Sequence, residues 1–170
     1  MSQRKERKES DEADLKRWLS NAKKVVLVGI GNPLRKDDFV GLKIIRNLEN
    51  IVPESVLLIE GETVPESFIA PIVDFNPTHI LIIDAAVLSL KSGSFKLLKA
   101  RQIARYSTIS THTLPLRTFC DYLSRTTDAA IALLAIQPQN TSFGEGLTPT
   151  VSAVETKLTF LLSSLLRGNS

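Results

Sequence analysis

The fold is decided by residues 25–41, which read VVLVGIGNPLRKDDFVG. The first four of these residues are continuously apolar and mostly β-branched, which is typical of a strand buried on both faces of a parallel sheet. A glycine-rich turn follows, in which Gly29 and Gly31 allow a close backbone approach and Pro33 ends the strand. Asp37 and Asp38 come next. Two adjacent carboxylates repel each other, which favours a cation, a proton or a basic partner beside them.

Apolar strands and helical segments alternate along the rest of the chain. The pattern predicts strands over 56–59, 80–83 and 131–136, and helices over about 38–50, 65–75, 114–124 and from 149 to just before 168. The pattern also predicts a strand over 95–98, at an edge of the sheet, where it could run antiparallel to its neighbour. This order of elements indicates an α/β fold, a three-layer sandwich with a mostly parallel, twisted central sheet.

The chain has the size and composition of one domain. It has 170 residues and 43% hydrophobic content, enough for one sizeable core. We expect a disordered start over 1–9, an amphipathic helix over 10–23 and the α/β domain over 24–170. Leu15, Trp18 and Leu19 form the apolar stripe by which that helix would pack on the domain.

Charge and cysteine content exclude several classes of protein. The net charge of +3 comes from residues 1–24, where eight Lys and Arg face five Asp and Glu, and this segment has Trp18 as its single aromatic residue, so we expect no nucleic-acid partner. No apolar run approaches the roughly 20 residues of a membrane span, and the amino terminus lacks the apolar core of a signal peptide. Cys120 is the single cysteine, which excludes an intrachain disulfide. We expect a cytoplasmic protein, by default a monomer.

Three side chains are candidate metal ligands. Asp38 follows the first strand through the glycine turn, Asp84 closes the strand over 80–83, and His112 lies in a Ser/Thr-rich loop before a helix. Sites in parallel sheets form where the loops at the carboxyl ends of the strands converge. Two carboxylates and one imidazole suit a borderline divalent ion such as zinc or nickel, and they leave a position open for water or substrate.

These residues also have plainer interpretations, of which that of Asp84 is the weaker, because a carboxylate at the carboxyl end of a buried strand is often a site residue in this class of fold. Asp37 and Asp38 could be a helix cap and a residue of the first helical turn, and His112 alone is more often a surface residue than a ligand. The Gly-Ile-Gly turn could bind a dinucleotide, but the third glycine is missing and an acidic pair would face the pyrophosphate. Cys120 lies in an apolar helical stretch, which indicates a buried thiol rather than a nucleophile. We assign no role to His79.

The chain resembles the hydrogenase maturation endopeptidases, which trim the carboxy-terminal tail of the nickel-iron hydrogenase large subunit. Five motifs carry the resemblance in the family's order, and it covers roughly residues 24–166. The motifs are residues 25–41, Ile82–Ala86, Ser110–His112, Ile136–Pro138 and Gly146–Val151.

The resemblance implies an endopeptidase that removes the carboxy-terminal extension of a large-subunit precursor after nickel insertion. Asp38, Asp84 and His112 would contact nickel that the precursor brings, with zinc or cadmium as possible surrogates. Either the metal polarises the scissile carbonyl or a bound water, or a carboxylate, Asp38 or Asp37, acts as general base on water. The alternative is a nickel carrier or assembly chaperone that senses the metal without cutting.

Two residues depart from the family pattern. Phe39 and Glu62 stand where glycine is usual, and a positive φ there would cost about 1 kcal/mol or more. These departures concern loop conformation and substrate choice rather than the class of activity. We expect substrate specificity to lie in the loops over 61–66, 86–93 and 137–147.

Overall fold

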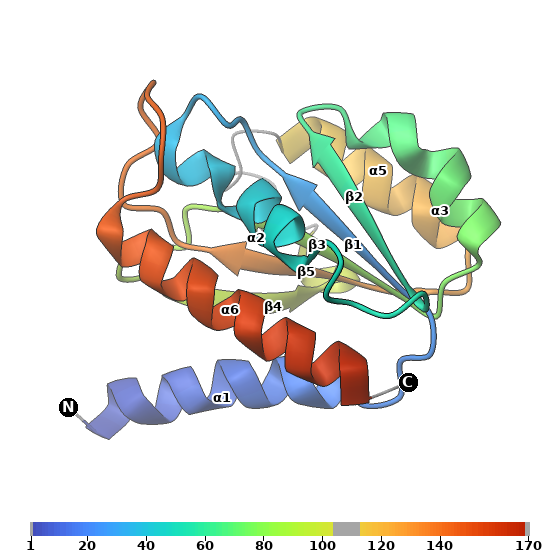
Figure 1. Cartoon of the computed structure of the whole chain (residues 1–170), viewed down its shortest axis with the longest axis horizontal. Helices are drawn as coiled ribbons and strands as arrows, with labels where there is room; N and C mark the ends of the chain where they lie inside the picture. The colour runs from blue at the N-terminus through green and yellow to red at the C-terminus, as the bar shows by residue number, and fades with distance from the viewer. Residues whose placement is uncertain (1, 104–112, 169–170) are drawn as a thin grey trace.

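The computed structural model describes residues 2–103 and 113–168, and strands alternate with helices along it (Figure 1). The elements, in chain order, are α1 (Ser2–Leu19), β1 (Val25–Ile30), η1 (Lys36–Phe39), α2 (Val40–Leu48), β2 (Val56–Glu62), η2 (Pro65–Phe68), α3 (Ile69–Phe75), β3 (His79–Ala85), β4 (Phe95–Lys99), α4 (Ala100–Ile103), α5 (Thr113–Thr126), β5 (Ala130–Ile136) and α6 (Pro149–Gly168). The expected strands are all present.

The five strands form one sheet in the order β2-β1-β3-β5-β4. β1, β2, β3 and β5 run parallel, and β4 lies antiparallel to β5 at the edge. β1, β3 and most of β5 are buried, as their continuous apolar sequences predict. The prediction of a mostly parallel sheet with an edge strand near residues 95–98 is confirmed.

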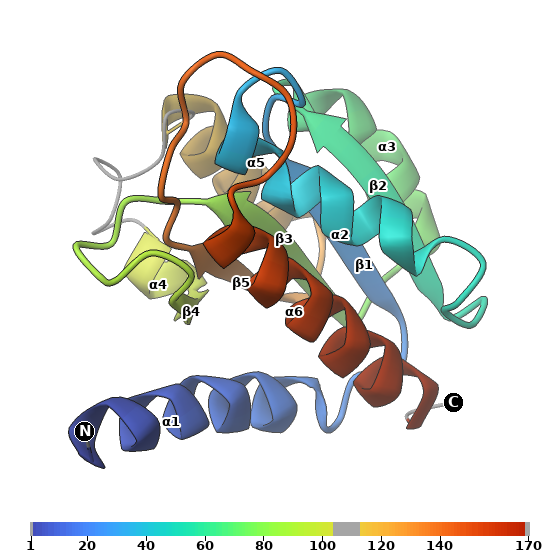
Figure 2. The same cartoon turned by 60° about the vertical axis from the view of Figure 1, so that its left-hand side comes forward.

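Helices cover both faces of the sheet, which makes the three layers expected from the sequence (Figures 1 and 2). Successive residues of a strand point to opposite faces. Val25 and Leu27 therefore join a core with residues of α1, α2 and α6, whereas Val26 and Val28 join a second core with residues of α3, α4 and α5.

The first helix is longer than the sequence predicts. We expected a disordered start over 1–9, but α1 begins at Ser2. Residues 3–9 are Gln, Arg, Lys and Glu, which are good helix formers and include no glycine or proline. The expected apolar stripe is confirmed, because Leu15 and Leu19 are buried and Trp18 packs against the same core. An ion pair between Glu12 and Lys157 also joins α1 to α6.

α6 is amphipathic, as its sequence predicts. It buries Val151, Leu158 and Leu162 against the sheet and exposes Phe160. No helix in the described part of the chain is both long and apolar enough to cross a membrane.

Candidate functional site

The sheet has a topological switch point between β1 and β3. These strands are neighbours, yet the chain leaves β1 through α2 toward β2 on one side of the pair and leaves β3 toward β4 on the other side. Connections that diverge in opposite directions from neighbouring strands open a crevice at the carboxyl ends of those strands, where α/β proteins bind their ligands. Asp38 lies in η1, just after β1, and Asp84 is the penultimate residue of β3. The structure therefore brings both predicted carboxylates to the switch point.

The turn after β1 holds the carboxylate of Asp38 in place. Gly31 has a φ of +139°, and a Cβ atom there would lie 1.7 Å from the backbone oxygen of Asp38. Only glycine fits so close an approach. The backbone N–H of Asn32 donates to Oδ2 of Asp38 at 2.8 Å. The Asp38 side chain is only 2% exposed.

A second glycine brings this loop against the strand that carries Asp84. A Cβ atom on Gly41 would lie 2.2 Å from the backbone oxygen of Ile83. The absence of a side chain lets the first turn of α2 rest on the end of β3, and η1 contacts the same strand. Asp84 follows Ile83 directly and is fully buried. A buried carboxylate at a strand end, beside a second one, is typical of an active or metal-binding site.

Asp37 has a different environment from Asp38. Its Oδ2 atom accepts from the backbone N–H groups of Gln139 and Asn140, both at 2.9 Å. Its Oδ1 atom accepts from the backbone N–H of Thr148 at 2.7 Å, and the Thr148 hydroxyl lies within 3.0 Å of both oxygens. Both oxygens of Asp37 thus hold the loop between β5 and α6. The acidic pair is visible in the sequence, but this division of roles is not.

Gln137 holds a further loop at the same edge, a role that the sequence did not predict. Its Oε1 atom accepts from the backbone N–H groups of Leu88 and Leu90 at 2.6 and 3.3 Å. The only signal in the sequence is a polar residue directly after a fully apolar strand. Gln137 therefore fixes the loop that follows Asp84.

The two departures from glycine have different structural consequences. Phe39 has a φ of −74°, an ordinary helical value, so no strain arises there. Its ring lies 5.2 Å from the guanidinium of Arg46. Glu62, in contrast, has a φ of +47°, the left-handed region in which glycine is favoured. The carbonyl of Glu62 accepts the N–H of Gly31 at 2.9 Å, so this strained residue braces the turn of the site.

The third predicted ligand, His112, lies outside the described residues. Within residues 2–103 and 113–168, no group of three or more His, Cys, Asp and Glu side chains is placed to hold a metal ion. The described part of the site therefore supplies two acidic oxygen donors, Asp38 and Asp84. Carboxylates are suitable ligands for a divalent ion, but two of them do not complete a coordination shell.

Cys120 and His79 take no part in this site. Burial raises the pKa of the Cys120 thiol to about 12, which makes it a poor nucleophile near neutral pH. His79 begins β3 at the opposite end of the strand from Asp84, and its ring packs edge-on against Trp18 with 4.8 Å between ring centroids. The prediction of a buried thiol at Cys120 is confirmed.

Comparison with known sequences gives one consistent result. The family model described as hydrogenase maturation protease matches residues 42–164. A putative hydrogenase maturation protease of Methanocaldococcus jannaschii is 41% identical over 133 residues, which cover 74% of this chain and 78% of the relative. The hydrogenase 3 maturation protease of Escherichia coli K12 is 31% identical over 132 residues, which cover 77% and 84% of the two chains.

Comparison with solved structures agrees with the sequence matches. The crystal structure of a [NiFe] hydrogenase maturation protease from Thermococcus kodakarensis superposes with a TM-score of 0.81 and 27% identity. The match covers 90% of this chain and 98% of that chain. The likeness thus extends over nine-tenths of this chain.

Proposed function

The chain belongs to the hydrogenase maturation protease family, and on that premise we propose that it removes the carboxy-terminal extension of a nickel-iron hydrogenase large-subunit precursor after nickel insertion. That the chain is a peptidase follows from its family. One observation on this chain's own residues supports the proposal. Two buried carboxylates, Asp38 and Asp84, lie at the switch point of the sheet, where substrates bind in this class of fold.

We propose that Asp38, Asp84 and His112 contact the nickel that the precursor brings. Carboxylate oxygens and an imidazole nitrogen suit nickel, and zinc or cadmium would be accepted as surrogates. For the two carboxylates, the support is their burial at one edge of the sheet. For His112, the support is the motif Ser110–His112 that resembles the family's histidine motif. In this scheme the enzyme recognises a precursor that is already loaded.

We propose that Asp38 rather than Asp37 acts as the general base on water. Both oxygens of Asp37 accept hydrogen bonds from the loop between β5 and α6, which gives Asp37 a structural role, whereas Asp38 lies at the switch point where substrates bind in this class of fold. Asp37 is then a positioning residue, and the base role allowed for it by the sequence stays a prediction. When bound, the metal supplies Lewis acidity toward the scissile carbonyl.

The partner is the precursor itself, and we propose that a monomer in the cytoplasm acts on it. One domain carries both described carboxylates, so the proposed chemistry needs no residue from a second copy. The free, buried thiol of Cys120 suits a reducing compartment.

The intact mass of the precursor tests this proposal. Purified large-subunit precursor, with and without nickel, is incubated with the wild-type chain, with Asp38→Asn, or with Asp121→Asn, which alters an exposed carboxylate on α5. We expect loss of the carboxy-terminal peptide only from the nickel-loaded precursor, with the wild type and Asp121→Asn active. Asp38→Asn should bind the precursor without cutting it. If the wild type binds both forms stably and cuts neither, the protein is a carrier or chaperone and the proposal is wrong.

A further inference from the structure

Exposed apolar side chains surround the candidate site. Seven large apolar side chains are exposed in the described part of the chain, and four of them lie on the loops that follow the four parallel strands. They are Leu34 after β1, Val64 after β2, Val87 after β3 and Phe143 after β5. Because parallel strands end at the same edge of a sheet, all four loops border the edge that carries Asp38 and Asp84. We name these four side chains the apolar rim.

We propose that the apolar rim is the docking surface for the folded body of the precursor whose tail enters the site. This inference rests on the proposed function. A single exposed apolar residue needs no explanation, but one on each of the four described loops that follow the parallel strands does. Protein interfaces are enriched in aromatic residues and depleted in charge at their centre, and Phe143, with 80% of its surface exposed, is a suitable anchor.

The loop that carries Phe143 is held in place before any partner binds. The N–H of Gly144 donates to the carbonyl of Leu34 at 2.8 Å, and the carbonyl of Gly144 accepts from Lys36 at 2.9 Å. These bonds place the two apolar rim residues Leu34 and Phe143 on adjoining segments, which the carboxylate of Asp37 also joins. A surface that is already ordered loses little entropy when it binds.

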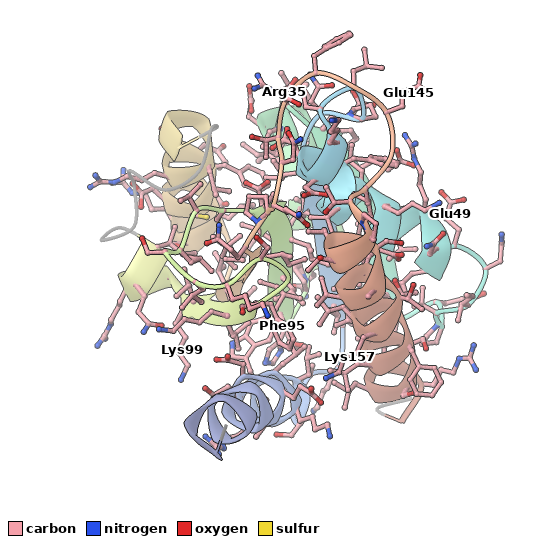
Figure 3. All side chains as sticks on the ribbon, turned by 90° about the vertical axis from the view of Figure 1, so that its left-hand side faces the viewer. Arg35, Glu49, Phe95, Lys99, Glu145 and Lys157 are labelled. Atoms are coloured by element: carbon pink, nitrogen blue, oxygen red, sulfur yellow. The ribbon has the colours of Figure 1, made fainter. Side chains whose placement is uncertain are left out.

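The end of the molecule at which these two loops meet is visible from the side. Figure 3 shows Arg35 and Glu145 at the same end of the molecule, where the β1–α2 and β5–α6 loops meet, whereas Lys157 lies near α1. The Nε atom of Arg35 donates to the carbonyl of Thr141 at 3.1 Å, which adds to the attachment between these loops.

The next loop around the edge is fixed in a similar way. Val87 adjoins Leu88, whose N–H donates to Oε1 of Gln137. The loops after β1, β3 and β5 are therefore joined through Asp37 and Gln137. Their apolar side chains form one prearranged surface rather than three independent loop tips.

The position of the apolar rim favours the precursor over a second copy of this chain. A precursor whose folded body binds the apolar rim brings its own tail to Asp38 and Asp84. The same contact therefore binds the substrate and places the peptide at the site. A second copy seated there would cover the edge that the tail must enter. The apolar rim therefore fits a protein that carries its own substrate peptide.

Two phenylalanines make a matched test. Phe143 on the apolar rim is 80% exposed, and Phe160 on α6 is 75% exposed but lies three helical turns from the site end of that helix. Immobilised, nickel-loaded large-subunit precursor is titrated with the wild type, Phe143→Ser and Phe160→Ser. We expect Phe143→Ser to raise the Kd for the precursor about tenfold, as the loss of an aromatic anchor does at other interfaces. Phe160→Ser should leave the Kd unchanged. At saturating precursor, the cleavage rate of Phe143→Ser should equal that of the wild type.

Equal affinities of the wild type and Phe143→Ser would overturn the docking role, whether or not the precursor is cut. A wild-type chain that does not bind the precursor would overturn it too. If light scattering showed a wild-type dimer that Phe143→Ser converts to a monomer, the rim would be a contact between copies instead. Rim-dependent binding without cleavage would leave the docking role standing and overturn the proposed function, so the two failures are distinguishable.

Discussion

Asp37 and Thr148 join two segments that lie 111 residues apart in the sequence. The carboxylate of Asp37 accepts the backbone N–H of Thr148 at 2.7 Å and also its hydroxyl. Thr148 directly precedes the first residue of α6, so the first strand's loop and the last helix meet at this point. The neighbouring Asp38 is held by a different contact, from the backbone N–H of Asn32, and lies at the switch point.

Asp37→Asn should destabilise the protein strongly. An amide places an NH₂ group where a carboxylate oxygen now accepts backbone N–H groups, so at least one buried donor loses its acceptor. We expect the free energy of unfolding to fall by about 2–4 kcal/mol, since hydrogen bonds to a charged group are the strong ones. Urea unfolding measures the change. Asp14→Asn, in an exposed pair with Arg17, is the control and should change stability by less than about 1 kcal/mol. A similarly small loss in Asp37→Asn would contradict this role.

The sequence predicted the fold because the fold depends on local patterns. The apolar runs of β1, β3 and β5 and the amphipathic face of α6 are each visible within a short window. The predicted positions of Asp38 and Asp84 followed from one further rule, that sites lie at the carboxyl ends of parallel strands. These predictions needed no knowledge of which distant segments touch.

What the sequence could not predict depends on long-range contacts. No local pattern indicates that Asp37 binds residues 139–148, or that Gln137 holds residues 88–90. The backbone angle at residue 62 depends in the same way on the neighbouring turn at Gly31. His112 lies outside the described residues, so its role stays a prediction from the resemblance alone.

Glu62→Gly should stabilise the protein. Glu62 has a φ of +47°, which a residue with a Cβ atom adopts at a cost of about 1 kcal/mol or more. Glycine removes that cost but loses more backbone entropy on folding, so we expect a net gain of up to about 1 kcal/mol. Thermal unfolding measures it. Glu62→Ala is the matched control, because alanine also removes the carboxylate but keeps the strain. If alanine stabilises as much as glycine, charge rather than strain is the cause.

Gly41→Ala should separate α2 from the end of β3. The added methyl group would lie 2.2 Å from the backbone oxygen of Ile83, which cannot rotate away. We expect a loss of about 3 kcal/mol or more, at the upper end for an overpacked core. The rate of precursor cleavage should also fall, because the shift moves Asp38 relative to Asp84. Gly168→Ala is the control, since a Cβ atom there meets nothing within 4 Å. Equal stability of the two variants would show that the backbone at Gly41 is free to adjust.

Acid should destabilise the protein through His79. Burial lowers the pKa of His79 below its usual 6.5, and a hydrogen bond with the backbone of Trp18 offsets part of that effect. The unfolded chain therefore binds a proton more readily than the folded one. Stability should be fully present above about pH 6.5 and fall as the pH drops below that value, by at most about 1.4 kcal/mol per pH unit from this residue.

Urea unfolding at a series of pH values between about 7.5 and about 5, which spans the ordinary pKa of histidine, tests the assignment. His79→Gln keeps a polar side chain that does not titrate, so its stability should fall less steeply with acid than that of the wild type. His112→Gln removes the only other histidine and should keep the wild-type slope. If the slope instead follows His112, the acid sensitivity belongs to the candidate site and not to the contact between β3 and α1.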